Sequence, residues 1–246
     1  MANKNTIFGI RTCIEAITSG KEIEKVLIKT GSGESLFQEL FKLINKNNVP
    51  FQYVPVEKLN RITSKNHQGV ISYISEINYH NIEQLIPAIF EKGEIPLLLL
   101  LDGITDIRNF GAISRTALCA GVHGIIVPTK RSAQINADAI KTSAGALLEI
   151  PVCRTDRLGF TIEYLKESGL QVIASNEKAS NLYWEADLSI PTAFILGAED
   201  VGISESNLKL CEKQVKIPVD DKIGSLNVSV ASGILLYETL RQRLII

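Results

Sequence analysis

The sequence contains few of the residues from which metal and redox sites are built. Its 246 residues include four cysteines and three histidines. The cysteines are spread from Cys13 to Cys211 without a C-x-x-C pair, and the histidines are equally scattered. Because metal ligands usually come in closely spaced pairs, we expect no metal site and interpret the cysteines as reduced, buried thiols.

Long apolar runs are also missing. The longest, at residues 95–101, is too short to cross a bilayer. The first ten residues, MANKNTIFGI, lack the apolar core of a signal peptide. With 45% hydrophobic and 22% charged residues, the composition is typical of a globular protein. We therefore expect a cytoplasmic protein with no membrane partner.

Neither sign of charge dominates the chain, whose formal net charge is −1. The charge is not evenly distributed, since residues 1–75 contain ten Lys or Arg and six Asp or Glu. A modestly basic first segment is compatible with an RNA partner but does not require one.

Strand and helix patterns alternate along the chain and divide it into three segments. Residues 1–75 predict a small α/β unit, with helices near 11–19 and 35–45 and strands at 26–29, 51–55 and 69–75. Residues 76–95 are polar and interrupted by Pro87 and Gly93, and predict a linker with a short helix. Residues 96–246 alternate apolar strands such as PLLLLLD with helical stretches, which predicts a mostly parallel sheet with helices on both sides.

Three glycine-containing loops follow predicted strands of the third segment, where open α/β sheets place their ligands. They are LDGITDIRNFGAISR at 101–115, LGAEDVGIS at 196–204 and IPVDDKIGSLNVS at 217–229. None of them contains a G-x-G-x-x-G fingerprint or a P-loop, so neither a dinucleotide nor a nucleoside triphosphate is indicated.

Each loop alone has a structural explanation. Asn109 could cap the helix that follows the first loop, with Arg115 as a solvated residue about two turns along it. Glu199, between glycines, could belong to an acidic turn. Ser225 is a suitable N-cap for the last helix, whereas Asn227 is a weak helix former that a cap does not explain. A structural role and a ligand-binding role therefore both stay open for each loop.

Taken together and in order, the three loops carry a more specific pattern. N-x-G-A-x-x-R, L-G-x-E-x-x-G and I-P-…-S-L-N-V-S-x-A closely resemble the three signature motifs of the SpoU–TrmH family of RNA ribose 2′-O-methyltransferases, in the SPOUT superfamily. The first segment, with IFGIRTCIEAI and HQGVISYIS, resembles that family's small substrate-binding domain of ribosomal-protein-like α/β fold. The resemblance covers nearly the whole chain and is greatest to members that methylate a guanosine of large-subunit ribosomal RNA.

The resemblance implies a set of partners and site residues. It implies an RNA substrate-binding domain at 1–75, a linker at 76–95, and at 96–246 a methyltransferase domain with a deep trefoil knot that binds S-adenosylmethionine. It also implies a homodimer. The implied cofactor-binding residues are Gly197, Ile217, Leu226, Ser225 and Asn227, and the implied catalytic residues are Arg115, Asn109, Glu199, Ser225 and Asn227. Among basic residues of the first segment, the candidate RNA contacts are Lys4, Arg11, Arg61, Lys65 and His67.

The implied reaction is the attack of a ribose 2′-oxygen on the methyl group of a sulfonium. A guanidinium has a pKa above ~12 and is a poor general base, but its fork of donors suits phosphate oxygens. Our hypothesis is that Arg115 clamps the target phosphate, while Glu199 and Asn227 position it. The chain departs from the family pattern at Asp200, where glycine is common, and at 220–222, where Asp-Asp-Lys replaces small residues near the RNA.

We expect ribosomal RNA rather than transfer RNA as the substrate, because the resemblance includes the N-terminal domain. Two alternatives belong to other classes of protein. One is a non-catalytic RNA-binding protein that keeps the knot as a scaffold, which the presence of all five catalytic positions opposes. The other is a small-molecule methyltransferase, for which the additional domain has no obvious use.

Overall fold

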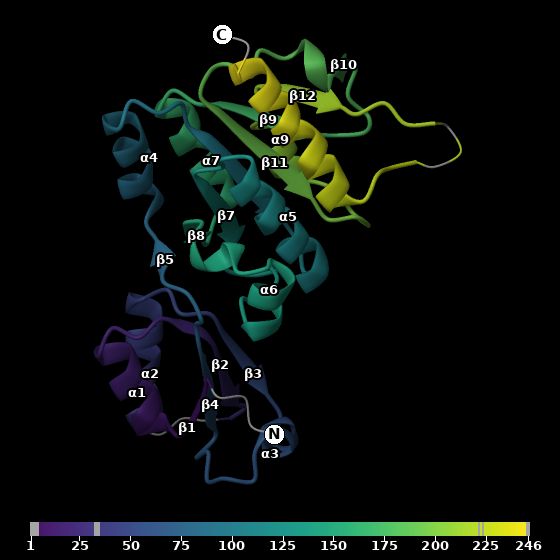
Figure 1. The fold of residues 1–246 in the computed structure, drawn as a ribbon. Coiled ribbons are helices and arrows are strands. Elements are labelled where there is room, and N and C mark those ends of the chain that lie inside the picture. Colours follow the sequence, from purple (N-terminus) through teal and green to yellow (C-terminus); the bar gives the residue numbers. More distant parts are fainter. Residues whose placement is uncertain (1–4, 32–34, 221, 223, 245–246) are drawn as a thin grey trace. The chain divides into compact units, whose positions relative to one another are not determined.

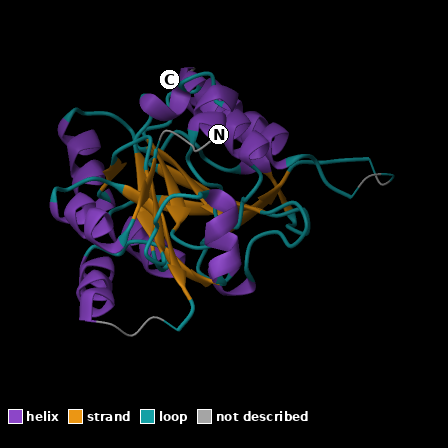
Figure 2. Cartoon of the chain, turned by 90° about the horizontal axis from the view of Figure 1, so that it is seen from below, coloured by secondary structure: helices purple, strands orange, loops and turns teal. Residues whose placement is uncertain are grey.

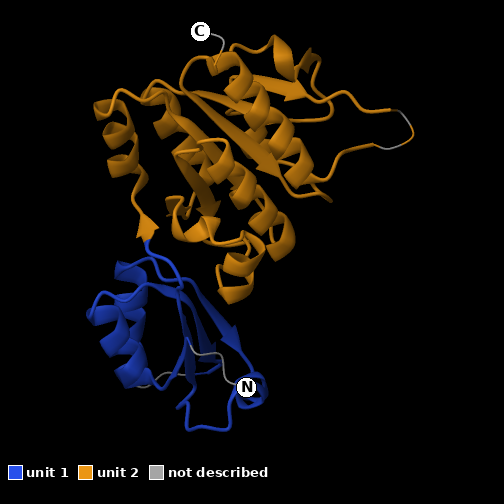
Figure 3. Cartoon of the chain, in the orientation of Figure 1, with its two compact units in different colours: residues 1–78 blue, residues 79–246 orange. Residues whose placement is uncertain are grey.

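The chain folds into two compact units, Met1–Asn78 and Tyr79–Ile246, in the computed structural model (Figure 3). The structure describes residues 5–31, 35–220, 222 and 224–244. Each unit has its own sheet and its own apolar core. The second unit includes Tyr79 onward, and therefore most of the segment that the sequence predicts as a linker.

Unit 1 is a four-stranded sheet with helices on both faces. Its elements are β1 (Thr6–Phe8), α1 (Ile10–Thr18), β2 (Ile23–Lys29), α2 (Ser35–Lys46), β3 (Phe51–Val54), α3 (Val56–Ile62) and β4 (Val70–Ile74). The strand order is β1-β4-β2-β3, in which only the β2–β3 pair is parallel. Successive side chains of β2 point to opposite faces, so Val26 and Ile28 pack with α1 and α2 while Leu27 packs with α3.

Unit 2 is built on an eight-stranded sheet in which every pair of neighbours is parallel (Figure 1). Its strands are β5 (Tyr79–His80), β6 (Leu97–Asp102), β7 (Gly124–Pro128), β8 (Val152–Thr155), β9 (Gln171–Ser175), β10 (Asn181–Leu182), β11 (Thr192–Gly197) and β12 (Lys213–Lys216). Its helices are α4 (Ile82–Glu91), α5 (Ile107–Cys119), α6 (Ala137–Thr142), α7 (Leu158–Glu167), α8 (Glu205–Leu208) and α9 (Val228–Leu244), with 3-10 turns at Ala146–Leu148 and Tyr183–Glu185.

Helices cover both faces of this sheet, as the strands and helices of Figure 2 show. On one face α4 and α7 pack on the alternate side chains Leu98 and Leu100 of β6. On the other face α5 and α9 lie side by side. All five leucines of β6 are at most 2% exposed. This two-sided burial is why the strand reads as a continuous apolar run instead of an alternating one.

The order of the strands is β10-β12-β9-β11-β6-β7-β8-β5. The chain moves outward from β6 to β8, crosses to β9, and then inserts β11 between β9 and β6. The α/β class with a parallel sheet is as expected, and the implied knot is compatible with this order but stays a prediction.

Neither a membrane span nor a metal cluster is found among the described residues. Within those ranges no helix is both long and apolar enough to cross a membrane. The same ranges contain no group of three or more His, Cys, Asp or Glu residues that could hold a metal ion.

Candidate active site

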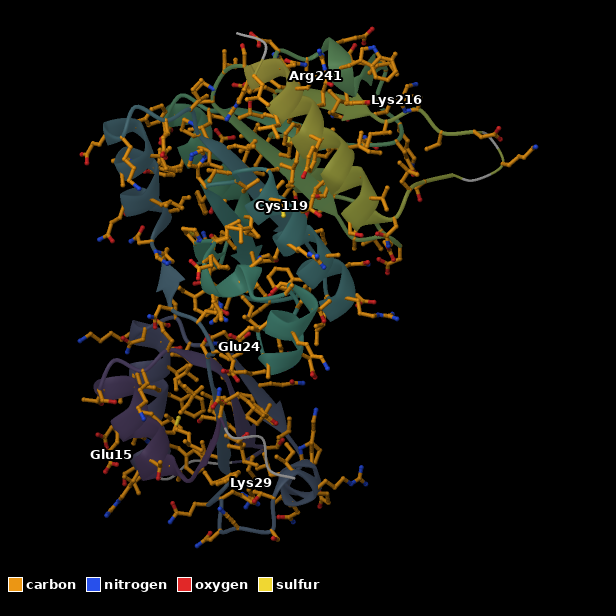
Figure 4. All side chains as sticks on the ribbon, viewed as in Figure 1. Glu15, Glu24, Lys29, Cys119, Lys216 and Arg241 are labelled. Carbon is orange, nitrogen blue, oxygen red and sulfur yellow. The ribbon has the colours of Figure 1, made fainter. Side chains whose placement is uncertain are left out.

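The carboxyl ends of β9, β11 and β12 border a cavity of about 560 Å³ in unit 2. The lining comes mainly from segments 175–178, 196–203, 216–219 and 224–226. Lys216, labelled in Figure 4, is the last residue of β12 and part of this lining. The volume is within the range of small-molecule and cofactor sites, about 300–1,000 Å³. Of the predicted cofactor-binding residues, Gly197, Ile217, Leu226 and Ser225 line it.

Gly197 lets the loop after β11 fold back on the end of that strand. The loop closes with Gly202 N–H donating to Ala198 O at 2.8 Å. A Cβ at Gly197 would lie less than 3.0 Å from backbone atoms of Gly202 and Ile203, closer than Cβ atoms essentially ever come. Only glycine leaves room for this fold, which brings Glu199 to the rim of the cavity.

Asp102, which sequence reasoning missed, fixes the far end of the same loop. Its Oδ2 accepts hydrogen bonds from Ser204 N–H and Asn207 Nδ2, both at 2.9 Å. The available signal was its place at the carboxyl end of a buried strand, where open α/β sheets bind their ligands. The lining segment 175–178 was missed as well, although it also follows a predicted strand.

Three predicted catalytic residues from three separate loops meet at one point. Asn227 Nδ2 donates to Asn109 Oδ1 at 3.0 Å and forms a second, short hydrogen bond to Glu199 Oε1. Glu199 and Asn227 are exposed and Asn109 is half-buried, so the network lies at the surface. It joins the start of α5, the loop after β11 and the start of α9.

The structure corrects both capping interpretations. The N-cap of α5 is Asp106, whose Oδ1 accepts from Arg108 N–H at 2.7 Å, and Asn109 is inside the first turn. Asn227, not Ser225, caps α9, since its Oδ1 accepts from Ser229 N–H at 2.9 Å. Asn227 therefore stands just before the helix, where its weak helix propensity carries no cost.

Arg115 lies apart from this network. It is an exposed residue of α5, and in the described ranges its guanidinium makes no hydrogen bond or ion pair. Arg108, the second residue of α5, pairs with Asp106 at 3.0 Å. That hydrogen bond holds the pKa of the Asp106 carboxyl below its ordinary value, and it raises the pKa of Arg108, to which Glu199 adds a smaller electrostatic contribution.

The candidate RNA contacts of unit 1 differ in accessibility. Arg11, Arg61 and Lys65 are exposed, and Lys65 Nζ is 5.6 Å from the centre of the Phe8 ring. His67 is buried, with Nδ1 accepting from Gly69 N–H and Nε2 2.9 Å from Asn60 Oδ1, so both ring nitrogens are engaged internally. Lys4 lies outside the described residues.

The described residues at which the chain departs from the family pattern are exposed loop residues. Asp200 and Asp220 are exposed, and Asp220 Oδ1 accepts from Lys222 N–H at 3.0 Å. Asp221 is outside the described residues.

Comparison with known proteins identifies the family. The SpoU rRNA Methylase family matches residues 96–237, and a domain described as RNA 2′-O ribose methyltransferase substrate binding matches residues 6–80. The chain belongs to the SpoU rRNA methylase family. The resemblance inferred from the three motifs is thereby confirmed, and so is the enzyme class, because the family consists of RNA methyltransferases that use S-adenosylmethionine.

Two similar proteins span nearly the full length of this SpoU family member, and a third spans 66% of it. It is 33% identical over 237 residues to the putative TrmH family tRNA/rRNA methyltransferase YacO of Bacillus subtilis, covering 96% of this chain and 95% of that one. The SpoU methyltransferase AviRb of Streptomyces viridochromogenes, solved in complex with AdoMet, has the same fold, with 22% identity, a TM-score of 0.62, and coverage of 98% and 90%. A TrmH/SpoU tRNA modifying enzyme from A. aeolicus is 28% identical, with a TM-score of 0.57 and coverage of 66% and 84%.

Proposed function

We propose that this protein transfers a methyl group from S-adenosylmethionine to a ribose 2′-hydroxyl of RNA, a guanosine of large-subunit ribosomal RNA being the favoured target. One observation carries the proposal. Glu199 lines the cavity, and it is joined with Asn227 and Asn109 in one hydrogen-bonded network at the cavity's edge. A cavity for the cofactor thus lies next to a polar cluster that could bind the second reactant.

The cavity suits S-adenosylmethionine, which supplies an electrophilic methyl group on a sulfonium. Gly197 allows the loop after β11 to fold back into the cavity wall, and Ile217 and Leu226 line the same cavity. Backbone donors and acceptors on a fixed path can hold the polar parts of such a ligand. Ser225 belongs to this lining and would contact both cofactor and RNA.

The polar cluster would hold the RNA hydroxyl in line with the reacting carbon. Asn227 already bonds two partners and so fixes the loops of Asn109 and Glu199 relative to one another. Alignment of this kind contributes a large share of the rate in bimolecular transfers. Arg115, always charged, would bind the phosphate of the target nucleotide and orient its hydroxyl, with the proton leaving to phosphate or water.

The deciding experiment is methyl transfer from labelled S-adenosylmethionine to unmodified 23S-type ribosomal RNA and to transfer RNA. We expect label at one alkali-resistant linkage of the ribosomal RNA and its loss with Arg115→Ala. Label in transfer RNA would keep the enzyme class and refute the substrate choice. Cofactor binding without transfer to any RNA would favour a binding-only protein. An Arg115→Lys variant with full turnover and unchanged RNA affinity would contradict the clamp.

We also propose that the active form is a homodimer formed through the exposed side of α5 and α9. Leu118, Val230 and Tyr237 are 40–51% exposed on these helices, and apolar side chains gathered on neighbouring helices are typical of subunit interfaces. Arg115 is on the same helix as Leu118, so it could serve the partner's site. Mixing Arg115→Ala and Gly197→Ala subunits tests this, because activity returns only if the two residues act across the interface.

A further inference from the structure

The loop between β7 and α6 carries an arginine that the site described above does not use. Arg131 is exposed, and its backbone φ of +61° lies in the left-handed region that disfavours residues other than glycine. Its Nη2 is 3.6 Å from the point where a Cβ of Gly103 would stand, and the Cβ of Ala198 is 3.8 Å from the same point. The guanidinium is therefore within about 7.4 Å of Ala198, the sum of these two distances, and Ala198 directly precedes Glu199.

Backbone hydrogen bonds hold Arg131 in this place. Ala133 N–H donates to Ile104 O at 2.8 Å, which ties the loop after β7 to the loop that leads into α5. Ala198 N–H donates to Asp102 O at 3.1 Å, which ties the loop after β11 to the same turn. Figure 1 shows α5 and α6, the helices that follow the first two loops, next to each other. The position of Arg131 beside the site is thus a property of the fold.

The guanidinium has no partner within the described parts of the chain. No hydrogen bond or ion pair joins Arg131 to a described residue, and two carboxylates of this edge bond elsewhere. Asp102 accepts from Ser204 and Asn207, and Glu199 accepts from Asn227. Five N–H donors in a rigid fork therefore stay available at the rim of the site.

We propose that Arg131 binds a phosphate of the RNA chain next to the nucleotide that is methylated, and so sets which ribose reaches the site. The inference rests on the function proposed above and adds a second phosphate contact to that of Arg115. Guanidinium and phosphate match in charge and in bidentate geometry. A residue in an unfavourable backbone region persists where the surrounding structure demands its direction, and here that direction is toward the loop of Glu199.

The test uses Arg131→Gly, Arg131→Lys and the control Lys92→Ala. Glycine removes the guanidinium and suits the left-handed backbone, so folding is preserved. Lys92 is an exposed cation that follows α4, five residues before β6 begins, and its removal changes the net charge equally. RNA affinity is measured by filter binding to a 23S-type ribosomal RNA transcript at several salt concentrations, and cofactor affinity by calorimetry.

We expect Arg131→Gly to weaken RNA binding roughly tenfold to a hundredfold, as for loss of a charge-assisted hydrogen bond. The slope of log affinity against log salt should fall by about 0.7–0.9, the value for one lost phosphate contact, while cofactor affinity stays unchanged. Arg131→Lys should keep the slope and recover part of the affinity.

Two results would overturn the inference. One is an Arg131→Gly variant whose RNA affinity and salt slope equal those of Lys92→Ala. The other is a large loss of thermal stability with an unchanged slope, which would make Arg131 a support for the turn at Gly103. If the wild type transfers methyl groups in either case, the proposed function stands and only this inference fails. A salt slope that depends on Arg131 in a protein that transfers no methyl group would support the phosphate contact and refute the proposed function.

Discussion

A single methyl group added at Gly197 should displace the loop that carries Glu199 and weaken binding of S-adenosylmethionine to the proposed site. Its Cβ would meet the backbone of Gly202 and Ile203 at under 3.0 Å, whereas ordinary contacts begin near 3.4 Å. Backbone cannot rotate away as a flexible side chain can, so the loop of Glu199 would have to move by roughly 1 Å or more. Overpacking of this kind costs about 1–3 kcal/mol. If the cost falls on the closed loop, cofactor affinity drops roughly 5- to 150-fold in Gly197→Ala.

Isothermal titration of S-adenosylmethionine into wild type and Gly197→Ala measures this loss directly. Gly233→Ala is the matched control, because its Cβ would meet only Thr116 Cγ2, at an ordinary 3.6 Å, inside α9. Alanine there should stabilise the helix by about 0.5–1 kcal/mol and leave cofactor affinity unchanged. Wild-type affinity in Gly197→Ala would refute the reasoning, since it would show that the folded-back loop is not needed for binding.

Three further outcomes follow from other contacts. Asn227→Ser should keep the cap of α9 but lose the amide that bonds Glu199 and Asn109, so kcat should fall while the melting temperature stays unchanged. Asn227→Ala should lower both kcat and the melting temperature. Equal melting temperatures for the two variants would contradict this reasoning. Ser232→Ala should leave the free energy of unfolding in urea unchanged or raise it, because the buried hydroxyl has no partner among described residues. Ser114→Ala is the comparison, since it removes a 2.8 Å hydrogen bond to the carbonyl of Phe110 and should lower the free energy of unfolding by about 1 kcal/mol. Burial is the largest influence on the pKa of His123 and lowers it, so the folded protein resists protonation of this side chain. The contribution of neutral His123 to the free energy of unfolding is therefore fully present above about pH 6.5 and declines as the pH falls below that value. Urea titrations at several pH values should show a flatter decline for His123→Asn.

Apolar runs in the sequence predicted the parallel sheet of unit 2. PLLLLLD coincides with β6, because a strand buried on both faces leaves a continuous apolar run. Shorter elements were missed. β8 has four residues and β5 two, too few for a period to show, and each forms only through its neighbours in the sheet. The order of the strands was also beyond reach, since nothing local in β11 says that it inserts between β6 and β9.

The site residues were predictable from the sequence motifs, and only partly from helix and strand patterns. Gly111 shows the difference, because its place in N-x-G-A suggested a ligand loop. In the structure a Cβ there would lie 2.7 Å from the Thr142 side chain, so the glycine allows α5 to pack against α6. The network of Asn109, Glu199 and Asn227 depends on three chain segments far apart in sequence, and no spacing within one segment encodes that meeting.

The side chain of Asn227 caps α9 and also bonds the two loops that carry Asn109 and Glu199. Its Oδ1 accepts from Ser229 N–H and its Nδ2 donates to Asn109 and Glu199, so the two ends of one amide serve different purposes. Aspartate would cap the helix but has no N–H to donate to Glu199 and Asn109, and serine has no second polar group that could reach the other loops. The need to do both selects asparagine. The start of α9 is thereby fixed against the two loops that border the cavity, which couples the position of the helix to the geometry of the site.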